Sequence, residues 1–383
     1  MKKVRLLHIQ VLPIMSGVQK AMLEILKRLD RNTYDITVLC NSEGDLTRAV
    51  DLSNFNFIVL PELKRKIHPV DDLISFIKLI KLIKKNKFDI VHSHSSKPGF
   101  IGRLAAKAAG IKCIVHTVQG FAFHERSSKL TIYVVSLLEK LAGLAGDKVI
   151  FVNNKDRIVA SQMNLIPKYK MTTIYNGIDL SSFINECPQK ITKDLIGFEK
   201  KGAIVGMTAR LWKQKAPQDF ISSIPFIIQE LPYTMFMVIG DGPLQYELEK
   251  LSEELTIRKN VIFLGWRNDV KDLLKLLDVF VLPSLWEGLP LSILEAMACS
   301  KPVVASNIKG NNELVVHGET GFLVPPENPQ KIGERVLELL KNKTLAKAMG
   351  QKGYQRVKEK FDIRKTVYLT NLVYETLLNN NNN

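Results

Sequence analysis

The alternation of short apolar runs with segments of helical period is the feature that most constrains this fold. The first half carries seven runs of strand length, namely VRLLHIQV, DITVLC, FNFIVL, FDIVHSHS, CIVHTV, KVIFVN and MTTIYN. Beyond residue 180 six more follow, namely AIVGMTA, TMFMVIGD, VIFLGW, VFVLPS, KPVVAS and GFLVPP. Helical segments such as KAMLEILKRL separate many of them. An order of strand, helix, strand predicts parallel sheets covered by helices on both faces.

A chain of 383 residues favours two domains, because single cores rarely grow beyond about 300 residues. The fold class expected is α/β, with two tandem Rossmann-like domains and a cleft between them. Residues 184–201 lack strand character and contain Pro188, so they are the predicted linker. This gives a first domain at 1–183, a second at 202–360, a last helix at 361–378 and a frayed poly-Asn tail at 379–383.

The positive charge lies mostly in the first half of the chain. Residues 1–180 contain 28 Lys and Arg against 15 Asp and Glu, whereas residues 181–383 contain 26 against 23. This asymmetry indicates an anionic partner, although a genome that favours lysine codons would also produce it. No signature of a nucleic-acid-binding motif accompanies the charge, so nucleic acid is not the expected partner.

Targeting and cysteine patterns favour a cytoplasmic protein. No apolar run reaches the roughly 20 residues of a membrane span. The opening MKKVRLLHIQVLP is interrupted by His8, Gln10 and Pro13 and is followed by no cleavage site. The four cysteines form no Cys-x-x-Cys pair, which argues against a zinc site or a disulfide framework.

Two acids eight positions apart, Glu287 and Glu295, mark a candidate ligand site. Glu287 lies in a Gly/Pro loop after the strand VFVLPS, and Glu295 lies in the helix that follows. Ligands of open α/β sheets bind at the carboxyl ends of strands, and helix N-termini attract anions. A nucleoside diphosphate suits this position. Spacing alone equally allows a capping acid and a solvated acid.

Three other loops add to this candidate site. Arg210 and Lys215 follow the strand AIVGMTA, where two cations could hold a diphosphate; solvated loop charges are the alternative. Gly17 opens a helix after the first strand, where backbone can approach a ligand. Gly240 and Gly242 form only part of a dinucleotide fingerprint, which argues against a dehydrogenase.

These motifs together resemble the family 4 glycosyltransferases of the two-Rossmann-domain (GT-B) type. The segment EGLPLSILE matches the E-x7-E motif of that family, and ARLWKQKA, YNGID, FLGW and GETGFLVPP match further elements. The resemblance runs over nearly the whole chain. It implies retaining transfer of a sugar from a nucleotide donor, without a metal or other cofactor. The chain contains no Asp-x-Asp triplet, which fits a site that uses no metal.

The resemblance also implies roles for individual residues. Arg210 and Lys215 would stabilise the leaving diphosphate, Glu287 would orient the donor sugar, and Glu295 would hold the ribose. The remaining donor-binding residues would be Gly17, Trp266, Gly288, Leu289, Pro290 and Leu291. The base would meet the backbone near Trp266, Gly17 would face the diphosphate, and the last helix would return to the first domain.

The chain departs from the family on the acceptor side. Gln119-Gly120 stands where a His-Gly pair is usual, and Ser16, Ala209 and Ser300 replace glycines. The candidate acceptor-side residues are His94, His116, Gln119 and His124. For His116 and His124 the alternative, an ordinary core or surface histidine, is the favoured interpretation. His92 and His94 share a strand face, but no third metal ligand is evident, so no metal site is expected.

The segment DDLISFIKLIKLIKKNK predicts an amphipathic helix with a basic face. Ile77, Ile80 and Ile83 gather on one side of this helix. The candidate membrane-docking residues are Lys78, Lys81, Lys84 and Lys85. Docking on an anionic inner leaflet is the functional interpretation; packing on the sheet with a solvated lysine face is the alternative.

The sequence therefore predicts a retaining glycosyltransferase at the inner face of the cytoplasmic membrane. The donor expected is a nucleotide-sugar, most simply a UDP-sugar, and the acceptor a lipid-linked saccharide in the assembly of a surface polysaccharide. A soluble glycosyltransferase that makes a small glycoside is the alternative within the same class. An inactive scaffold with this fold is disfavoured because Glu287, Glu295, Arg210 and Lys215 are all present.

Overall fold

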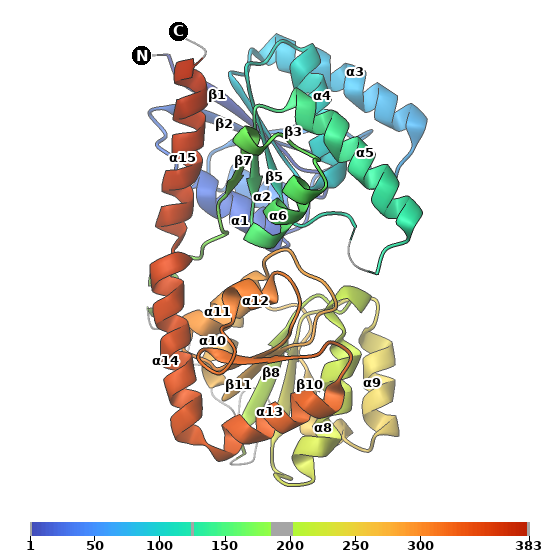
Figure 1. Cartoon of the computed structure of the whole chain (residues 1–383), viewed down its shortest axis with the longest axis vertical. Helices are drawn as coiled ribbons and strands as arrows, with labels where there is room; N and C mark the ends of the chain where they lie inside the picture. Colours follow the sequence, from blue (N-terminus) through green and yellow to red (C-terminus); the bar gives the residue numbers. More distant parts are fainter. Residues whose placement is uncertain (1, 124–125, 185–201, 381–383) are drawn as a thin grey trace. The chain divides into compact units, whose positions relative to one another are not determined.

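A computed structural model of the chain describes residues 2–123, 126–184 and 202–380, which divide into two compact units (Figure 1). The first unit comprises Met1–Asn176 and Ile363–Asn383, and the second comprises Gly177–Asp362. Each unit contains one parallel sheet, so the predicted α/β class with two Rossmann-like domains is confirmed.

The first unit contains a seven-stranded parallel sheet in the order β3-β2-β1-β4-β5-β6-β7. Its strands are β1 Val4–Ile9, β2 Tyr34–Cys40, β3 Asn56–Val59, β4 Ile90–His94, β5 Cys113–Val118, β6 Lys148–Phe151 and β7 Met171–Thr173. The sequence runs outward from β1 to β3, then crosses back to β4 beside β1. The winding of the sheet therefore reverses between β1 and β4, which is where open α/β sheets bind ligands.

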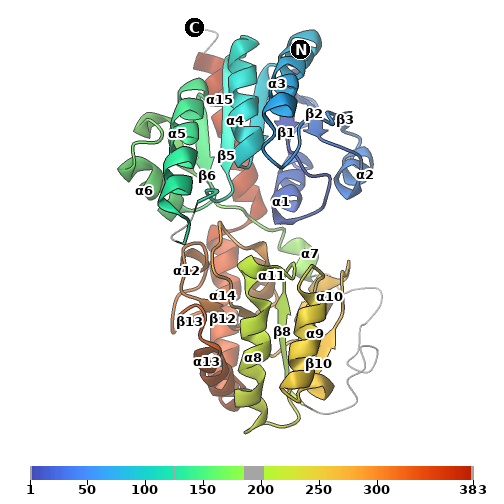
Figure 2. The same cartoon turned by 90° about the vertical axis from the view of Figure 1, so that its right-hand side faces the viewer.

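Helices cover both faces of this sheet (Figures 1 and 2). They are α1 Gly17–Leu26, α2 Asp45–Asp51, α3 Pro69–Asn86, α4 Ser96–Ala108, α5 Lys129–Ala145, α6 Asn154–Gln162 and α15 Ile363–Asn380. Leu6 and Ile90 pack on one face with residues of α1 and α15, whereas Leu7 and Val91 pack on the other with residues of α3 and α4. Alternation along each strand thus divides the core between two faces. On the second face α3, α4 and α5 lie side by side (Figure 2).

The second unit repeats this arrangement with six parallel strands in the order β10-β9-β8-β11-β12-β13. The strands are β8 Ile204–Thr208, β9 Met235–Ile239, β10 Val261–Phe263, β11 Val279–Leu282, β12 Val303–Ser306 and β13 Gly321–Val324. The helices are α7 Ser181–Ile184, α8 Pro217–Ile228, α9 Gln245–Glu254, α10 Val270–Leu276, α11 Leu291–Ala298, α12 Asn311–Leu314, α13 Pro329–Lys341 and α14 Lys343–Lys360. Here the winding reverses between β8 and β11.

The long helices begin where the sequence supplies caps. Asn328 caps α13 by accepting a hydrogen bond from the backbone of Lys331, and Pro329 occupies the first helical position. Helix α3 follows the same plan, with His68 as cap, Pro69 at the first position and two aspartates in the first turn. Proline and acidic residues are favoured there because the first backbone N–H groups lack intrahelical partners.

The C-terminal helix returns to the first unit, as the family resemblance implied. Helix α15 buries Ile363, Thr366, Thr370 and Tyr374, a spacing of three to four residues that forms one helical face. The hydroxyl of Thr366 donates to the carbonyl of Tyr175, 2.9 Å away.

Three of the predicted domain limits change, the first being the start of the last helix, which lies at Ile363 rather than at residue 361. Residues 177–183 belong to the second unit rather than the first, because Ile178 pairs with Asp362 and Phe183 lies under the ammonium of Lys271. All but the first residue of the predicted linker, 185–201, lies outside the described residues, as do 381–383. Asn379 and Asn380, assigned to a frayed tail, continue α15 instead.

Four buried histidines lie on the strands of the first unit. Burial lowers the pKa of His8, His92 and His116 well below the ordinary 6.5 and lowers the pKa of His94 to about 3. These imidazoles are therefore neutral in the folded chain at pH 7. The unfolded chain takes up protons on them below about pH 6.5, so folding stability is lost as the pH falls from that value.

We predict that the free energy of unfolding falls steeply with falling pH, and that each buried histidine contributes to this slope. Below pH 6.5 the free energy of unfolding should fall by about 1.4 kcal/mol per pH unit for each such histidine. Replacing His8→Asn should make this slope shallower by about that amount. Scanning calorimetry between pH 5 and 7 measures it, and equal slopes in the two proteins would contradict it.

Candidate functional site

The candidate site lies at the winding reversal of the second unit, where the loops after β8 and β11 meet. The backbone N–H of Leu285 donates to the carbonyl of Gln214 at 2.8 Å, and the Gln214 amide donates to the carbonyl of Trp286 at 2.9 Å. These bonds fix the loop that carries Arg210 and Lys215 against the loop that carries Glu287.

Glu287 lies at the centre of this group and is only 7% exposed. Its Oε1 accepts hydrogen bonds from the hydroxyl of Ser284 at 2.7 Å and from the Nζ of Lys215 at 2.5 Å. The structure therefore brings two of the predicted residues into direct contact, although they are 72 positions apart in the sequence. A part-buried ion pair of this kind is costly to break by removing one partner, because the other charge stays behind.

Arg210 precedes Lys215 on the same loop, and its side chain is exposed. Its guanidinium lies over the ring of Trp212, 4.2 Å from the ring centroid. Stacking of this kind orients a guanidinium while leaving its N–H groups at the edge of the ring for other partners. The cation at the carboxyl end of β8 is thus positioned for an anionic ligand.

Gly240 and Gly242 have a packing role next to this loop. Both have positive φ, and a Cβ on them would lie 2.0 Å from the carbonyl oxygen of Ala209 and 2.5 Å from that of Leu211 respectively. The glycines let the loop after β9 contact the backbone on either side of Arg210. Close backbone packing therefore explains Gly240 and Gly242 without a dinucleotide-binding role, in agreement with the incomplete dinucleotide fingerprint of the sequence.

The remaining predicted donor residues surround the same end of the sheet. Helix α11 starts at Leu291, directly after the buried Leu289 and Pro290. Glu295 lies half-buried in the second turn of α11 and contributes, after burial, to raising the pKa of Cys299 to about 12. Trp266 follows β10 and is about half exposed.

The predicted donor and acceptor residues of the first unit lie in different places. Gly17 is exposed at the first position of α1. His94 and Gln119 line a small cavity of about 20 Å³. His124 lies outside the described residues.

The acceptor-side expectation for His116 is not supported by its position. His116 lies on the opposite face of the sheet from His94, bonded to Ser93 and packed under α4. A Cβ on Gly99 of α4 would lie 2.2 Å from its ring, which shows how closely the helix covers it. His116 is therefore a core side chain.

Several residues that shape the two sites were not predicted. Ser284 precedes Glu287 by three positions in the same loop. A hydroxyl at that spacing could have been predicted to donate a hydrogen bond to the carboxylate. His8 lies two residues after Leu6 on the first strand and shares its face, so the face of His8 could also have been predicted. Gly310 and Tyr374 are distant in sequence from what they contact, and no local pattern marks them.

Comparisons with known proteins agree with this geometry. Residues 15–182 match the family model Glycosyltransferase Family 4, and residues 189–356 match Glycosyl transferases group 1. The chain is 40% identical over 326 residues to the UDP-Gal:alpha-D-GlcNAc-diphosphoundecaprenol alpha-1,3-galactosyltransferase of Escherichia coli, covering 84% of each protein. It is 28% identical over 371 residues to the capsular polysaccharide biosynthesis glycosyltransferase CapM of Staphylococcus aureus, covering 94% of each.

A solved structure gives the same fold. HepE of Anabaena, in complex with UDP and glucose, superposes with a TM-score of 0.85 at 20% identity, covering 97% of this chain and 100% of HepE.

The contact between Gly310 and the Glu287 loop yields a stability prediction. Gly310 has φ 88°, and a Cβ there would lie 2.6 Å from the carbonyl oxygen of Gly288 and 3.0 Å from the Cβ of Glu287. Gly318 has φ 79° with nothing within 4 Å of such a Cβ. Gly310→Ala should therefore destabilise the chain by about 1–3 kcal/mol more than Gly318→Ala. Calorimetry of both variants measures the difference. Equal losses of stability would contradict the prediction, because they would show that the Glu287 loop moves aside at no cost.

Proposed function

The chain belongs to the family 4 glycosyltransferases, and on that basis we propose that it transfers a sugar from a UDP-sugar to a saccharide linked to undecaprenyl diphosphate. Transfer proceeds with retention and without a metal, in the assembly of a surface polysaccharide. The observation that carries the proposal is the Lys215–Glu287–Ser284 group at the winding reversal, where nucleotides bind in this fold class, with Arg210 on the loop that carries Lys215. The printed name of the E. coli relative supplies the donor and acceptor classes.

The charges of the site suit the departure of a nucleoside diphosphate. Arg210 and Lys215 stabilise the negative charge that grows on the leaving phosphate, which is the role a divalent cation has in other transferases. A diphosphate oxygen competes with Glu287 for the ammonium of Lys215, so donor binding is coupled to a rearrangement of the ion pair. Glu287 then accepts a hydrogen bond from a hydroxyl of the donor sugar, and Glu295 accepts from the ribose.

The reaction needs no protein nucleophile in this scheme. The bond between the anomeric carbon and the diphosphate oxygen breaks while a bond to the acceptor oxygen forms on the same face of the sugar. The acceptor proton passes to an oxygen of the leaving phosphate. The alpha linkage in the printed name of the relative is consistent with retention when the donor is alpha-linked.

The first unit presents a surface suited to a lipid-linked acceptor. Helix α5 exposes an apolar row at the helical spacing of three, four and seven residues, formed by Leu130, Tyr133, Val134, Leu137, Leu141 and Leu144. Its inward face instead carries Glu139, which pairs with the buried Arg103 of α4 at 2.7 Å. Helix α5 thus turns apolar side chains toward the solvent and holds an ion pair inside.

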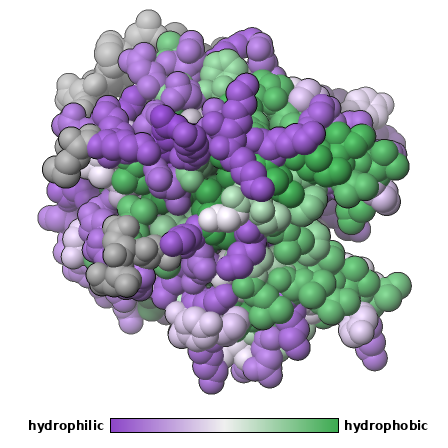
Figure 3. Space-filling model, turned by 90° about the horizontal axis from the view of Figure 1, so that it is seen from above, coloured by the Kyte–Doolittle hydropathy of each residue, from purple (hydrophilic) through white to green (hydrophobic). Residues whose placement is uncertain are grey.

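Helix α3 adds a second apolar row and the basic residues. Its buried side is formed by Ser75, Leu79 and Ile83, so Ile77 is exposed rather than grouped with Ile83. The exposed row is Val70, Leu73, Ile74 and Ile77. Figure 3 shows hydrophobic side chains gathered on the side of the first unit where α3 and α5 lie.

The predicted docking lysines of α3 are all exposed. Lys78 pairs with Glu62 at 2.5 Å, which leaves Lys81, Lys84 and Lys85 as those for which the described residues supply no ion-pair partner. Apolar rows flanked by lysines favour an anionic membrane surface, at about 1 kcal/mol per basic residue. None of the described helices is long and apolar enough to cross a bilayer. We propose that α3 and α5 hold the enzyme on the inner face of the cytoplasmic membrane.

Transfer to a lipid-linked acceptor tests the proposed function. The chain is incubated with UDP-sugars and either GlcNAc-diphosphoundecaprenol or small soluble acceptors. The expected result is product with the lipid-linked acceptor and one UDP-sugar, and a loss of at least about a hundredfold in Glu287→Gln. Transfer to the soluble acceptors alone would overturn the lipid-linked assignment in favour of a small glycoside.

Vesicle flotation tests the membrane surface formed by α3 and α5. Binding should require phosphatidylglycerol and should fall by about tenfold in the double variant Leu137→Glu and Leu144→Glu. Leu52→Glu is the matched control, because Leu52 is exposed beyond the end of α2 and outside the two apolar rows. Equal binding of all three proteins, or equal binding to neutral vesicles, would rule this surface out.

A further inference from the structure

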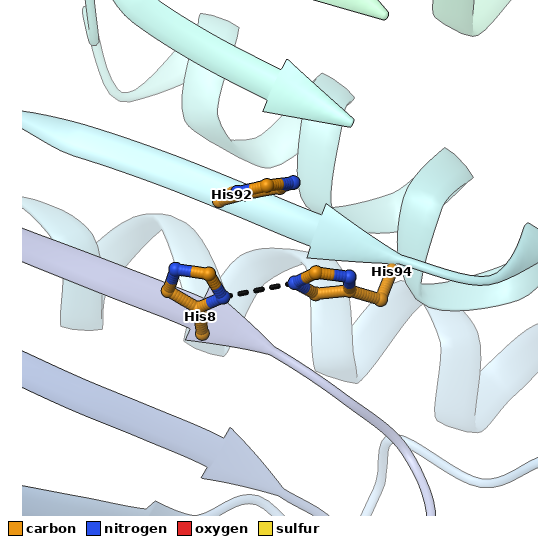
Figure 4. A group of neighbouring side chains, drawn as sticks. All are labelled: His8, His92 and His94. Atoms are coloured by element: carbon orange, nitrogen blue, oxygen red, sulfur yellow. Dashed lines mark hydrogen bonds between the residues drawn. The ribbon is translucent and has the colours of Figure 1, made fainter. Parts of the chain in front are cut away.

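Three imidazoles meet at the winding reversal of the first unit (Figure 4). His8 lies on β1, His92 and His94 lie on β4, and His8 is the register partner of His92. All three are buried, and Nδ1 of His8 lies 2.9 Å from Nε2 of His94. The polar residues thus occupy the carboxyl ends of the two strands at which the winding reverses, whereas Leu6 and Ile90 earlier on the same face are core residues.

The contact between His8 and His94 is one link of a longer chain. Nε2 of His8 lies 3.2 Å from the hydroxyl of Tyr374, and the same hydroxyl lies 2.5 Å from Nδ1 of His92. Nε2 of His92 lies 2.7 Å from the hydroxyl of Thr117 on β5. A continuous chain of hydrogen bonds therefore runs from Thr117 through His92, Tyr374 and His8 to His94, and Tyr374 brings α15 into it.

Each member of this chain has one proton to donate. Burial lowers the pKa of the three histidines and raises that of Tyr374, so the imidazoles are neutral and the phenol is protonated. With one donor each, and with a phenol oxygen that can accept two bonds, the four bonds can all be made in three ways. In two of them His94 donates from Nε2 and has a bare Nδ1, and in the third it carries an Nδ1–H.

The distances select one of these arrangements. A separation of 2.5 Å is shorter than the usual range of an N–H donor, and hydroxyl donors form the shorter bonds, so the hydroxyl of Tyr374 donates to His92. A separation of 3.2 Å suits an N–H donor, so Nε2–H of His8 donates to Tyr374. Nδ1 of His8 must then accept from Nε2–H of His94, which leaves Nδ1 of His94 with a lone pair.

Nδ1 of His94 has no hydrogen-bond partner among the described residues. It lies on the side of the ring turned away from the bond to His8 (Figure 4). His94 also lines the cavity of about 20 Å³, together with the amides of Gln119 and Asn176, which are bonded to each other at 3.1 Å. A cavity of this size holds one water-sized group, and a buried lone pair without a donor costs about 1–3 kcal/mol.

A metal is the competing interpretation of three clustered imidazoles, because their ligand atoms all lie within 4.8 Å of one another. The hydrogen bonds argue against it. Five of the six ring nitrogens already have a partner, and a metal would have to displace the bonds to Tyr374 or Thr117.

We propose that the chain from Thr117 to His94, closed by Tyr374 of α15, fixes His94 as a hydrogen-bond acceptor and that His94, Gln119 and Asn176 bind one hydroxyl group of the acceptor saccharide. This inference rests on the proposed transfer to a saccharide. It makes Tyr374 a positioning residue that acts through His8 and His92, and it assigns the C-terminal helix a part in acceptor binding. A buried water could donate the same hydrogen bond to His94 as a sugar hydroxyl. The kinetic test below distinguishes these two occupants.

Nitrogen NMR of histidine-labelled protein tests the chain directly. The wild type should show His94 as the Nε2–H tautomer with a bare Nδ1, and Tyr374→Phe should change the His94 nitrogen shifts. Tyr34→Phe is the matched control, because Tyr34 bonds Asn371 of the same helix and touches none of the three histidines through a hydrogen bond. Unchanged shifts in Tyr374→Phe, equal changes in both variants, or zinc bound in one-to-one ratio would overturn the proposal.

Kinetics with GlcNAc-diphosphoundecaprenol test the hydroxyl site. His94→Gln keeps a donor toward His8 and removes the Nδ1 acceptor, so it should raise the KM for the acceptor by about tenfold and leave the KM for the donor unchanged. His94→Asn can place its amide oxygen near the position of Nδ1 and should change the acceptor KM less, by about threefold. An unchanged acceptor KM in His94→Gln would assign the cavity to a water and overturn the proposal. Absence of transfer by the wild type would overturn the proposed function, while the nitrogen spectra would still decide the tautomer.

Discussion

The reversal of strand order in each sheet is the constraint on which both candidate sites depend. Crossovers between parallel strands are right-handed, so a chain that winds outward from its first strand must return to the other side of that strand to continue. At that point two neighbouring strands end with their loops diverging, and backbone and side-chain polar groups there lack partners from the sheet. In the first unit the reversal gathers His8, His92 and His94, and in the second it gathers Arg210, Lys215 and Glu287.

The two sites use burial in different ways. In the second unit a part-buried ion pair holds opposite charges 2.5 Å apart, so an anionic ligand can be exchanged for a carboxylate without leaving the ammonium uncompensated. At the site in the first unit burial keeps His8, His92 and His94 neutral, and neutrality lets hydrogen bonds alone decide which ring nitrogen carries the proton. In the proposed function the charged site serves the diphosphate, and in the proposed acceptor contact the neutral, directional site serves a hydroxyl.

The sequence was sufficient for what depends on local pattern. The thirteen strands among the described residues all follow from apolar runs, and Glu287 was correctly placed in the loop after β11 because a Gly/Pro segment separates strand and helix. Contacts between distant segments were not predictable. The pairing of Lys215 with Glu287 and the insertion of Tyr374 between His8 and His92 depend on which loops and helices the topology brings together. The exposed position of Ile77 was also missed, because helical period gives the faces of α3 but not which face meets the sheet.

The central claim is that protein cations, rather than a metal, stabilise the leaving diphosphate. Sugar transfer by protein dialysed against EDTA, measured before and after adding Mg²⁺ or Mn²⁺, tests this most directly, with Lys215→Met alongside the wild type. The account predicts a wild-type rate that EDTA leaves unchanged and a loss of about a hundredfold or more in Lys215→Met that no metal restores. A wild-type rate abolished by EDTA and restored by Mn²⁺ would contradict it.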